Sequence, residues 1–496
     1  MRLAISAAGI ASAQGGLTQS FNSTGLRKPE SWPWPVSGWT TSHVCRSAVG
    51  VNSDSGGIAR WKDLVQLALA DCFGNELPDG DTPIFIGSCN GATDGIDSSN
   101  WRKSFDSIQL LETTPWAGKR FPIFSSSCNS GLHALFAATK ALEAGAKEAV
   151  VLGVDILSQI NQSNFESLRV LAEYPAAPWQ QDSSGFILGE AAVALKITAS
   201  SKSGAVAKLT GPVLTNSLGE TDGLMRVLDS LPSFSAAILL GQGTGPNTRD
   251  QSELAAFRNK IEDSVHVSTP LLHFGHTLGA SGLLSIALAF KAQSESRVPK
   301  TLAMSMPMLT SMSSKAACDG RPLVVGSERL DTSDCILVTS GAMDGSCAGA
   351  FIGSAREDFQ TQGKQGTEEV WQQPQPAGPL THQTLRQIAA DAIAHRPERP
   401  PDLLLVRLLE PLAPPASAWF GKRLLPSAVL EITPGFVSQL IARCWGFTGP
   451  ALCMVGETET VAKRWELVPA CEALRLSVVR IDVKGTGDNR EIIWKA

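Results

Sequence analysis

The chain has 496 residues, 43% of them hydrophobic and 18% charged, which leaves room for two or three domains around a sizeable core. A net charge of −5 and the lack of a basic run exclude a typical nucleic-acid-binding protein. Ten cysteines occur without a Cys-x-x-Cys pair or a Cys/His cluster at metal spacing. We therefore expect reduced thiols, no metal site and no bound cofactor.

The first residues mimic a secretory signal, because Met1 and Arg2 precede a short apolar stretch that contains Ala-Ser-Ala. This stretch is weakly apolar and is interrupted by Ser and Gly, and it serves equally well as a first buried strand over Leu3–Ile10. No segment approaches the ~18 uninterrupted apolar residues that a membrane span needs. We therefore expect a cytoplasmic protein without a membrane span.

Short apolar runs alternate with amphipathic helices from residue 1 to about residue 354, a pattern typical of an α/β protein with a mainly parallel sheet. A helix is expected over 130–146, because its apolar residues recur at i, i+3 and i+4. The expected strands are Leu3–Ile10, Pro83–Gly87, Ala149–Val154, Ala192–Ile197, Ala236–Leu240 and Cys335–Thr339.

The composition changes to Gln, Gly, Pro and Glu over 357–380, which predicts a linker. This linker separates a first domain, 1–356, from a smaller α/β unit over 381–496, which we call the C-terminal unit. The elements expected in the C-terminal unit are a helix over Thr381–His395, a strand over Leu403–Leu409, a helix over Phe436–Cys444 and a strand over Ala451–Val455.

Cys128 lies in the stretch SSSCNSGLH, where a β-like run ends and the helix over 130–146 begins. The free N–H groups and the positive end of such a helix favour thiolate over thiol, so we expect a lowered pKa and a nucleophilic Cys128. Taken alone, the same pattern also fits a packed, structural thiol.

Four blocks in the first 354 residues resemble, in order and type, the β-ketoacyl synthase (ketosynthase) branch of the thiolase superfamily. The blocks are SSSCNSGLHAL around Cys128, WQQDSSGFILGE over 179–190, GQGTGP over 241–246 followed by Asp250 and Glu253, and FGHTLGASG over 274–282. This resemblance implies a thiolase-like fold of two pseudo-repeated α/β halves, layered α-β-α-β-α, to which the smaller C-terminal α/β unit is added.

The resemblance also implies the roles of individual residues. Cys128 would accept an acyl group from a carrier thioester, and His276 would act toward the second substrate as hydrogen-bond donor or base. The backbone N–H of Cys128 and one from a Gly-rich turn late in the domain would hold the oxyanion. In that turn Met343 stands where the family has a gating phenylalanine, and we expect Met343, Gly345 and Phe186 to line the substrate site.

Two positions depart from the family pattern. Gln242 stands in place of the first histidine of the Cys-His-His set, and Leu271 in place of the lysine upstream of the Gly-His block. An amide can donate a hydrogen bond to an enolate oxygen but cannot take a proton, so decarboxylative condensation is in doubt while acyl transfer onto Cys128 is not. His273 is an alternative substitute for the missing histidine, and His276 could also be a core histidine at a helix start.

The C-terminal unit shows a fainter resemblance, over 426–452, to the segment that leads into a ketosynthase nucleophile turn. The six-residue count from Pro122 to Cys128, repeated from Pro450, reaches Gly456, so the thiol is missing. The unit is therefore either a degenerate, non-catalytic ketosynthase half-domain or an unrelated α/β appendage.

These features predict an acyltransferase of polyketide or fatty-acid biosynthesis. It would load an acyl group from the phosphopantetheine thioester of an acyl carrier protein onto Cys128 and transfer it to a second substrate by Claisen-type condensation. The alternatives are a non-elongating transacylase and a catalytically silent, chain-length-factor-like partner of an active ketosynthase. The resemblance also implies a homodimer, or a heterodimer with another ketosynthase-like subunit, that forms beside the nucleophile helix.

Overall fold

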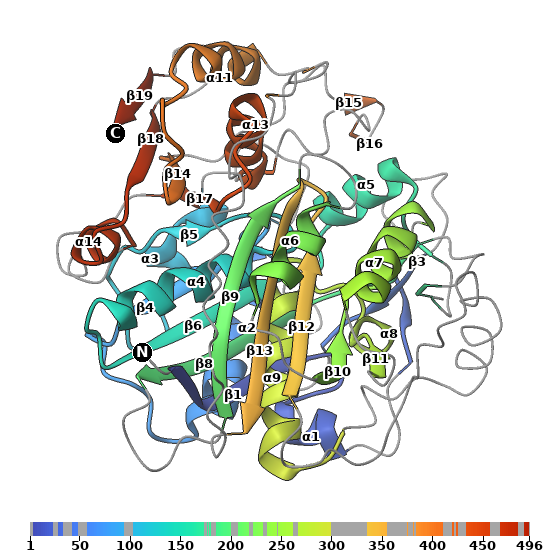
Figure 1. Ribbon diagram of the computed structural model, residues 1–496. Coiled ribbons are helices and arrows are strands. Elements are labelled where there is room, and N and C mark those ends of the chain that lie inside the picture. Colours follow the sequence, from blue (N-terminus) through green and yellow to red (C-terminus); the bar gives the residue numbers. More distant parts are fainter. Residues whose placement is uncertain are drawn as a thin grey trace.

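A computed structural model gives the arrangement of the chain, which is built around one mixed sheet of 14 strands (Figure 1). The described residues are 3–22, 28–32, 42–47, 57–93, 103–172, 176, 178–179, 185–199, 207–217, 222–231, 236–245, 247–260, 266–298, 335–354, 374, 380, 383–409, 419–420, 423–424, 433–456, 467–484 and 491–495. Apart from residues 374 and 380, the expected linker over 357–380 lies outside the described residues. None of the helices in this described part is long and apolar enough to cross a membrane.

The first half of the large sheet has the strand order β5-β4-β6-β8-β1. The strands are β1 (Leu3–Ser12), β4 (Ile84–Gly87), β5 (Ile123–Phe124), β6 (Glu148–Asp155) and β8 (Ala191–Ala199). Strand β4 runs parallel to β5 and β6, whereas β8 is antiparallel to both β6 and β1. Four of the six strands expected from the sequence are found here.

The second half repeats this topology with the order β11-β10-β12-β13-β9 and with the same relative strand directions. Its strands are β9 (Ala207–Asn216), β10 (Ala236–Leu240), β11 (His266–Ser268), β12 (Cys335–Gly341) and β13 (Ser346–Ser354). Numbered along the chain, the strands of each half follow the order 3-2-4-5-1, and β1 pairs with β9 to join the halves. The predicted pseudo-repeat of two α/β halves is confirmed.

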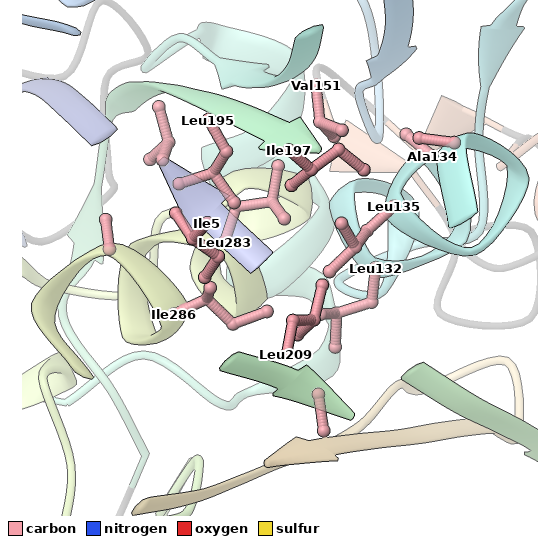
Figure 2. Close-up of a cluster of buried hydrophobic side chains, with 14 of the residues drawn as sticks. Ile5, Leu132, Ala134, Leu135, Val151, Leu195, Ile197, Leu209, Leu283 and Ile286 are labelled. Carbon is pink, nitrogen blue, oxygen red and sulfur yellow. The ribbon is translucent and has the colours of Figure 1, made fainter. Parts of the chain in front are cut away.

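Two apolar helices, α4 (Ser130–Glu143) and α9 (Ser281–Glu295), form the layer between the half-sheets and contact strands of both. Their side chains meet those of β1, β6, β8 and β9 in one buried cluster (Figure 2). Helix α2 (Gly57–Phe73) covers the outer face of the first half, and α6 (Asp222–Ser230) covers that of the second. The layers are therefore α-β-α-β-α, as expected for a thiolase-like fold.

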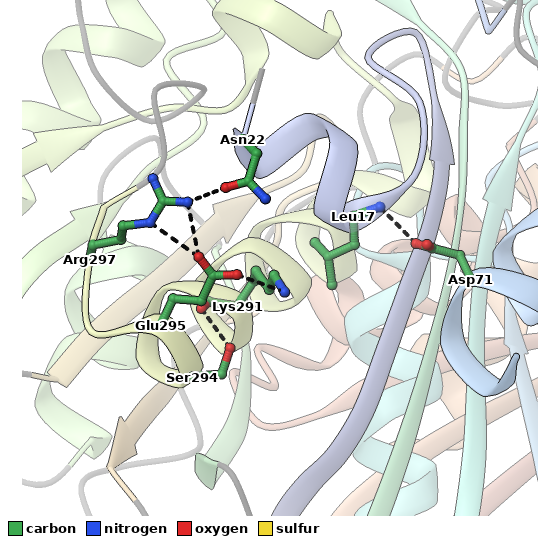
Figure 3. A network of polar contacts seen from close by, with 7 residues as sticks. All are labelled: Leu17, Asn22, Asp71, Lys291, Ser294, Glu295 and Arg297. Atoms are coloured by element: carbon green, nitrogen blue, oxygen red, sulfur yellow. Dashed lines mark hydrogen bonds and ion pairs between the residues drawn. The ribbon is translucent and has the colours of Figure 1, made fainter. Parts of the chain in front are cut away.

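Shorter elements connect these layers. They are α1 (Leu17–Asn22), β2 (Glu30–Trp32), β3 (Ser42–Cys45), η2 (Lys103–Phe105), α3 (Ser107–Leu110), α5 (Gln159–Leu168), β7 (Leu188–Gly189), α7 (Asn247–Lys260), α8 (Leu271–Phe274) and η3 (Leu278–Ala280). Asp71 of α2 accepts the backbone N–H groups of Ile10 and Leu17 at 2.8 and 2.7 Å, which fastens the start of α1 to the sheet (Figure 3). On the far side of α1, Arg297 contacts Asn22 and the Glu295 carboxylate.

The C-terminal unit continues the same sheet in the order β17-β14-β18-β19. Its elements are α11 (Gln383–Ala394), β14 (Leu403–Leu408), β15 (Trp419–Phe420), β16 (Arg423–Leu424), α13 (Gly435–Trp445), β17 (Ala451–Val455), α14 (Leu467–Ala473), β18 (Val478–Lys484) and β19 (Glu491–Lys495). The two helices and two strands expected here are confirmed. The unit has its own apolar core around Trp445 and Phe447, and a second set of its side chains joins the core of the first domain.

Strand β17 pairs antiparallel with β5, so the outer edge of β5 is occupied by the same chain. The resemblance implies a homodimer, or a heterodimer with another ketosynthase-like subunit, through a strand next to the nucleophile helix. A β-strand edge offers one row of backbone groups and can pair with only one neighbour. A symmetric dimer through the β5 edge is therefore excluded in this conformation.

Candidate active site

The nucleophile turn joins β5 directly to α4, and Cys128 lies two residues before the helix begins. Ser127 adopts a φ of 45°, a left-handed conformation that costs a non-glycine residue about 1–3 kcal/mol. The Ser130 hydroxyl holds the turn by accepting the backbone N–H of Ser126 at 2.9 Å and by donating to the carbonyl of Ser127 at 2.6 Å. The predicted strand-turn-helix setting of Cys128 is confirmed.

Cys128 and His276 come together across the interface of the two halves, with Sγ and Nε2 3.0 Å apart. The other ring nitrogen, Nδ1, lies 3.1 Å from the hydroxyl of Ser281, which sequence reasoning did not single out. The ring of Phe186 packs edge-on against the imidazole at 4.7 Å between centroids. Hydrogen bonding at one nitrogen and ring packing thus aim the other nitrogen at the thiol.

Both members of this pair are buried, and burial decides their charge. Burial raises the pKa of Cys128 to about 12, although the guanidinium of Arg249 acts in the opposite direction. Burial, aided by the same guanidinium, lowers the pKa of His276 to about 3. The expectation that the helix end lowers the thiol pKa is therefore wrong for the resting site, because the loss of hydration outweighs it. Both shifts favour the neutral forms, a thiol facing an uncharged imidazole.

Asp155, at the end of β6, connects the loop after β4 with the segment between His276 and α9. Its carboxylate accepts the backbone N–H of Cys89 at 2.9 Å and that of Gly279 at 2.7 Å, together with the hydroxyl of Ser88 at 2.8 Å. Burial raises the pKa of Asp155 to about 7, and these hydrogen bonds act against that rise. The carboxylate is a fixed anchor between the loop after β4 and the start of α9.

Gln242 follows β10 and is fixed by hydrogen bonds at both its backbone and its side chain. Its amide Nε2 donates to the hydroxyl of Ser340 at 2.6 Å, and its Oε1 accepts the backbone N–H of Gly341 at 3.3 Å. The backbone N–H of Gln242 donates to Glu253 at 2.9 Å. Asp250 in turn accepts the N–H of Gly245 at 2.8 Å, so the two acidic residues of this block hold the Gln242 loop in shape.

A small pocket of about 20 Å³, open to solvent, lies beside the imidazole, and Gln242, Leu271 and His276 are all in its wall. Thr269, Ser281 and Ser340 add hydroxyl groups to the lining. Gln242 and His276 therefore share a pocket. Cys128 is not in this wall, although its Sγ lies 3.0 Å from Nε2 of His276. His273, the proposed substitute, is also outside the wall.

Met343 and Gly345 both lie in the late turn between β12 and β13, but they make different contacts. Met343 packs against an apolar cluster that contains Phe186 and Leu271, but neither Met343 nor Phe186 is in the wall of the pocket beside His276. Gly345, at φ 99°, instead accepts the backbone N–H of Ser217 at 2.7 Å through its carbonyl. A Cβ at Gly345 would lie 3.0 Å from the carbonyl oxygen of Ser217, and Gly345 is not in the wall of the pocket.

Arg249 is a second residue that sequence reasoning missed. Its guanidinium donates to the carbonyl of Ala342 in the late turn at 2.7 Å. It also acts electrostatically on the thiol of Cys128 and on the imidazole of His276. A lone basic residue beside Asp250 in an otherwise acidic block was the only sequence signal for it.

Comparison with known proteins agrees with this geometry. Residues 122–202, which include the nucleophile turn, match the family described as "Beta-ketoacyl synthase, N-terminal domain". A chain of the complex between the ketosynthase ApeO and its chain length factor ApeC from Xenorhabdus doucetiae matches with a TM-score of 0.56. It is 18% identical, and the match covers 71% of this chain and 98% of that one. The chain has a ketosynthase fold.

Further solved structures extend the comparison of this ketosynthase-fold protein. A β-ketoacyl synthase from Burkholderia phymatum STM815 is 17% identical, with a TM-score of 0.56 and coverage of 72% of this chain and 100% of its own. The structure titled "PfaC Keto synthase-Chain length factor" is 13% identical, with a TM-score of 0.69 over 97% of this chain and 74% of its own. Comparison with curated proteins gives no match.

Proposed function

We propose that this ketosynthase-fold protein transfers acyl groups through a thioester on Cys128, taking them from the phosphopantetheine arm of an acyl carrier protein. The observation that carries the proposal is the 3.0 Å approach of Sγ to Nε2 of His276 at the end of a strand-turn-helix. A scaffold subunit has no need of a thiol aligned with an imidazole. The family match over 122–202 supports the same proposal.

The neutral state of the pair defines the first step. The Cys128 thiol attacks the thioester carbonyl and passes its proton to Nε2 of His276, while Nδ1 donates to Ser281. The tetrahedral intermediate then collapses, the C–S bond to the carrier breaks, and the imidazolium gives its proton to the departing thiolate of the phosphopantetheine arm. The backbone N–H of Cys128 and one from the late turn would hold the oxyanion during this step.

The second step is a Claisen-type condensation with a malonyl-type acceptor. The enolate formed when the carboxyl group leaves as carbon dioxide would attack the acyl carbonyl and release the Cys128 thiolate, which is reprotonated. Gln242 has one amide hydrogen left after its bond to Ser340 and could donate it to the enolate oxygen. Gln242 and Leu271 together leave this pocket with no cation of their own, so we expect condensation to be slow.

Those same two residues favour a second candidate, a transacylase that moves acyl chains between carriers without forming a carbon–carbon bond. The pocket next to His276 is lined by hydroxyl groups and by neutral Gln242 and Leu271. Such a lining suits a thiol or hydroxyl acceptor as well as it suits an enolate. The alternative of a silent, chain-length-factor-like subunit predicts that Cys128 is never acylated.

Intact-mass measurement after incubation with acyl carrier protein thioesters tests the proposal. We expect one acyl group per chain in the wild type and none in Cys128→Ala. Cys72→Ser is the matched control, because Cys72 is more accessible than Cys128 and lies on α2 away from the site. Acylation of Cys89 or Cys347 instead of Cys128 would show that the nucleophile is wrongly assigned.

A second incubation with malonyl-carrier protein distinguishes the candidates. A product longer by two carbons, with release of carbon dioxide, identifies a condensing enzyme. Transfer of the intact acyl group to a second carrier without such a product identifies a transacylase. A chain that is never acylated, although folded, would refute both and leave the silent partner.

A further inference from the structure

Within the residues that the structure describes, the C-terminal unit has the strand topology of a ketosynthase half without its first strand. The order β17-β14-β18-β19 is 3-2-4-5 in the numbering that gives 3-2-4-5-1 for each half of the first domain. The directions agree as well, since β14 is parallel to β17 and β18 while β19 is antiparallel to β18. A helix follows the third strand each time: α4, α9 and, here, α14. An unrelated appendage would not be expected to repeat all of these features.

The register of the strands relates the unit to the first half in particular. Aligning Pro450 with Pro122 places Ala451 where Ile123 stands, and the neighbouring strands then follow from their pairing partners. We then follow the strand pairing from β17 through β14 to β18, and likewise from β5 through β4 to β6. This places Asp482 at the position of Asp155. Each is a fully buried aspartate at the same position of the fourth strand.

The aligned strands meet each other about a local two-fold axis. Phe124 pairs with Met454 and Ile123 with Val455, and the N–H of Ser125 donates to the carbonyl of Cys453 at 3.0 Å. Ser125 and Cys453 are equivalent in the alignment, so the axis passes between them. The two helices that follow these strands, α4 and α14, also contact each other. This is the arrangement that two copies of the first half would form edge to edge.

We propose that the C-terminal unit is a truncated internal copy of the first half that replaces a second subunit, so that the protein works as a single chain. The edge of β5, which supports the nucleophile turn, is completed in cis by β17. The rise in coverage from 71% to 97% of this chain between two solved structures supports a ketosynthase-like fold for the unit. No second copy is then needed to cover β5.

The internal copy also reaches the active site. The first residue of α13, Gly435, packs backbone against backbone on the nucleophile turn, where a Cβ would lie 2.5 Å from the Cα of Ser126. The N–H of Asn216, beside the late turn, donates to the carbonyl of Thr448 at 3.0 Å. The C-terminal unit therefore forms the support on which both turns of the site rest.

Light scattering tests the single-chain state directly. We expect a molar mass of 52.4 kDa, that of one chain, across micromolar concentrations. A stable species of twice that mass, or a tight complex with another ketosynthase-like subunit that displaces β17, would overturn the proposal. Neither result depends on whether Cys128 is acylated, so the proposed function is tested separately.

A cross-link distinguishes pairing within a chain from exchange of the C-terminal unit between chains. Ile123→Cys combined with Val455→Cys places two thiols directly opposite on antiparallel strands, within disulfide reach. After oxidation with diamide, we expect one chain two hydrogens lighter, with a peptide map that joins positions 123 and 455. Leu408 pairs with Val455 one strand further from β5, so Ile123→Cys with Leu408→Cys is the control and should not close.

Covalent dimers of the first double variant would mean that β17 comes from another copy, and would overturn the proposal. Failure to form the 123–455 disulfide, with both thiols labelled by a maleimide in the folded protein, would overturn the pairing itself.

Discussion

A substitution that adds a single methyl group tests whether the C-terminal unit supports the nucleophile turn. In Gly435→Ala the new Cβ would lie 2.5 Å from the Cα of Ser126 and 2.6 Å from the carbonyl oxygen of Ser125. Both contacts are to backbone, so no side chain can rotate away. Restoring ordinary contact at 3.4 Å requires a displacement of about 0.9 Å in the turn that carries Cys128, in α13, or in both.

A misplacement of about 1 Å in a catalytic group can cost about 10²-fold in rate. We therefore expect Gly435→Ala to slow acylation of Cys128 by up to about 10²-fold, measured as the rate of the acyl mass shift per folded chain. Alanine is favoured over glycine inside a helix by about 1 kcal/mol, so the change does not weaken α13 itself. The effect should appear in the rate rather than in the fraction of chain that folds.

Gly9→Ala is the matched control, because its Cβ would lie 2.2 Å from the backbone nitrogen of Cys72, a comparable clash far from the site. Both variants should melt at lower temperature than the wild type, but only Gly435→Ala should lose acylation rate. If the two variants acylate equally fast, the contact is merely structural, and the support of the site by the C-terminal unit is wrong.

Two further predictions concern the pocket and the nucleophile helix. Gln242→His should raise malonyl decarboxylation, measured as released carbon dioxide, whereas Gln242→Ala should slow the native transfer by up to about 10²–10³ if the amide holds an oxyanion; no change in either variant would make Gln242 structural. Burial lowers the pKa of His133 from 6.5 to about 3, so stability is lost as pH falls below 6.5. From pH 7 to 5 the wild type should lose about 2 kcal/mol of unfolding free energy relative to His133→Leu in urea titrations, and equal pH dependence of the two proteins would contradict this.

The local structure around Cys128 could be predicted from the sequence because it depends on near neighbours in the chain. The run around Cys128 predicts a strand, a turn and a helix, and the periodicity of α4 is visible in its own residues. The resemblance carried by the four blocks implies the layered fold and a joint site for Cys128 and His276. Strand β5 was expected only as the β-like run before Cys128, without bounds, since two residues carry no periodic signal.

The charge of the catalytic pair and the number of chains at the β5 edge were decided only by the tertiary structure. A helix end beside Cys128 is visible in the sequence, but the degree of burial that reverses its effect on the pKa depends on residues from both halves of the domain. Likewise, the sequence places an apolar run at 451–455 without saying what it pairs with. Backbone hydrogen bonds are alike in every strand and therefore do not select a strand's partner. Only the packing of the C-terminal unit determines that β17 covers β5.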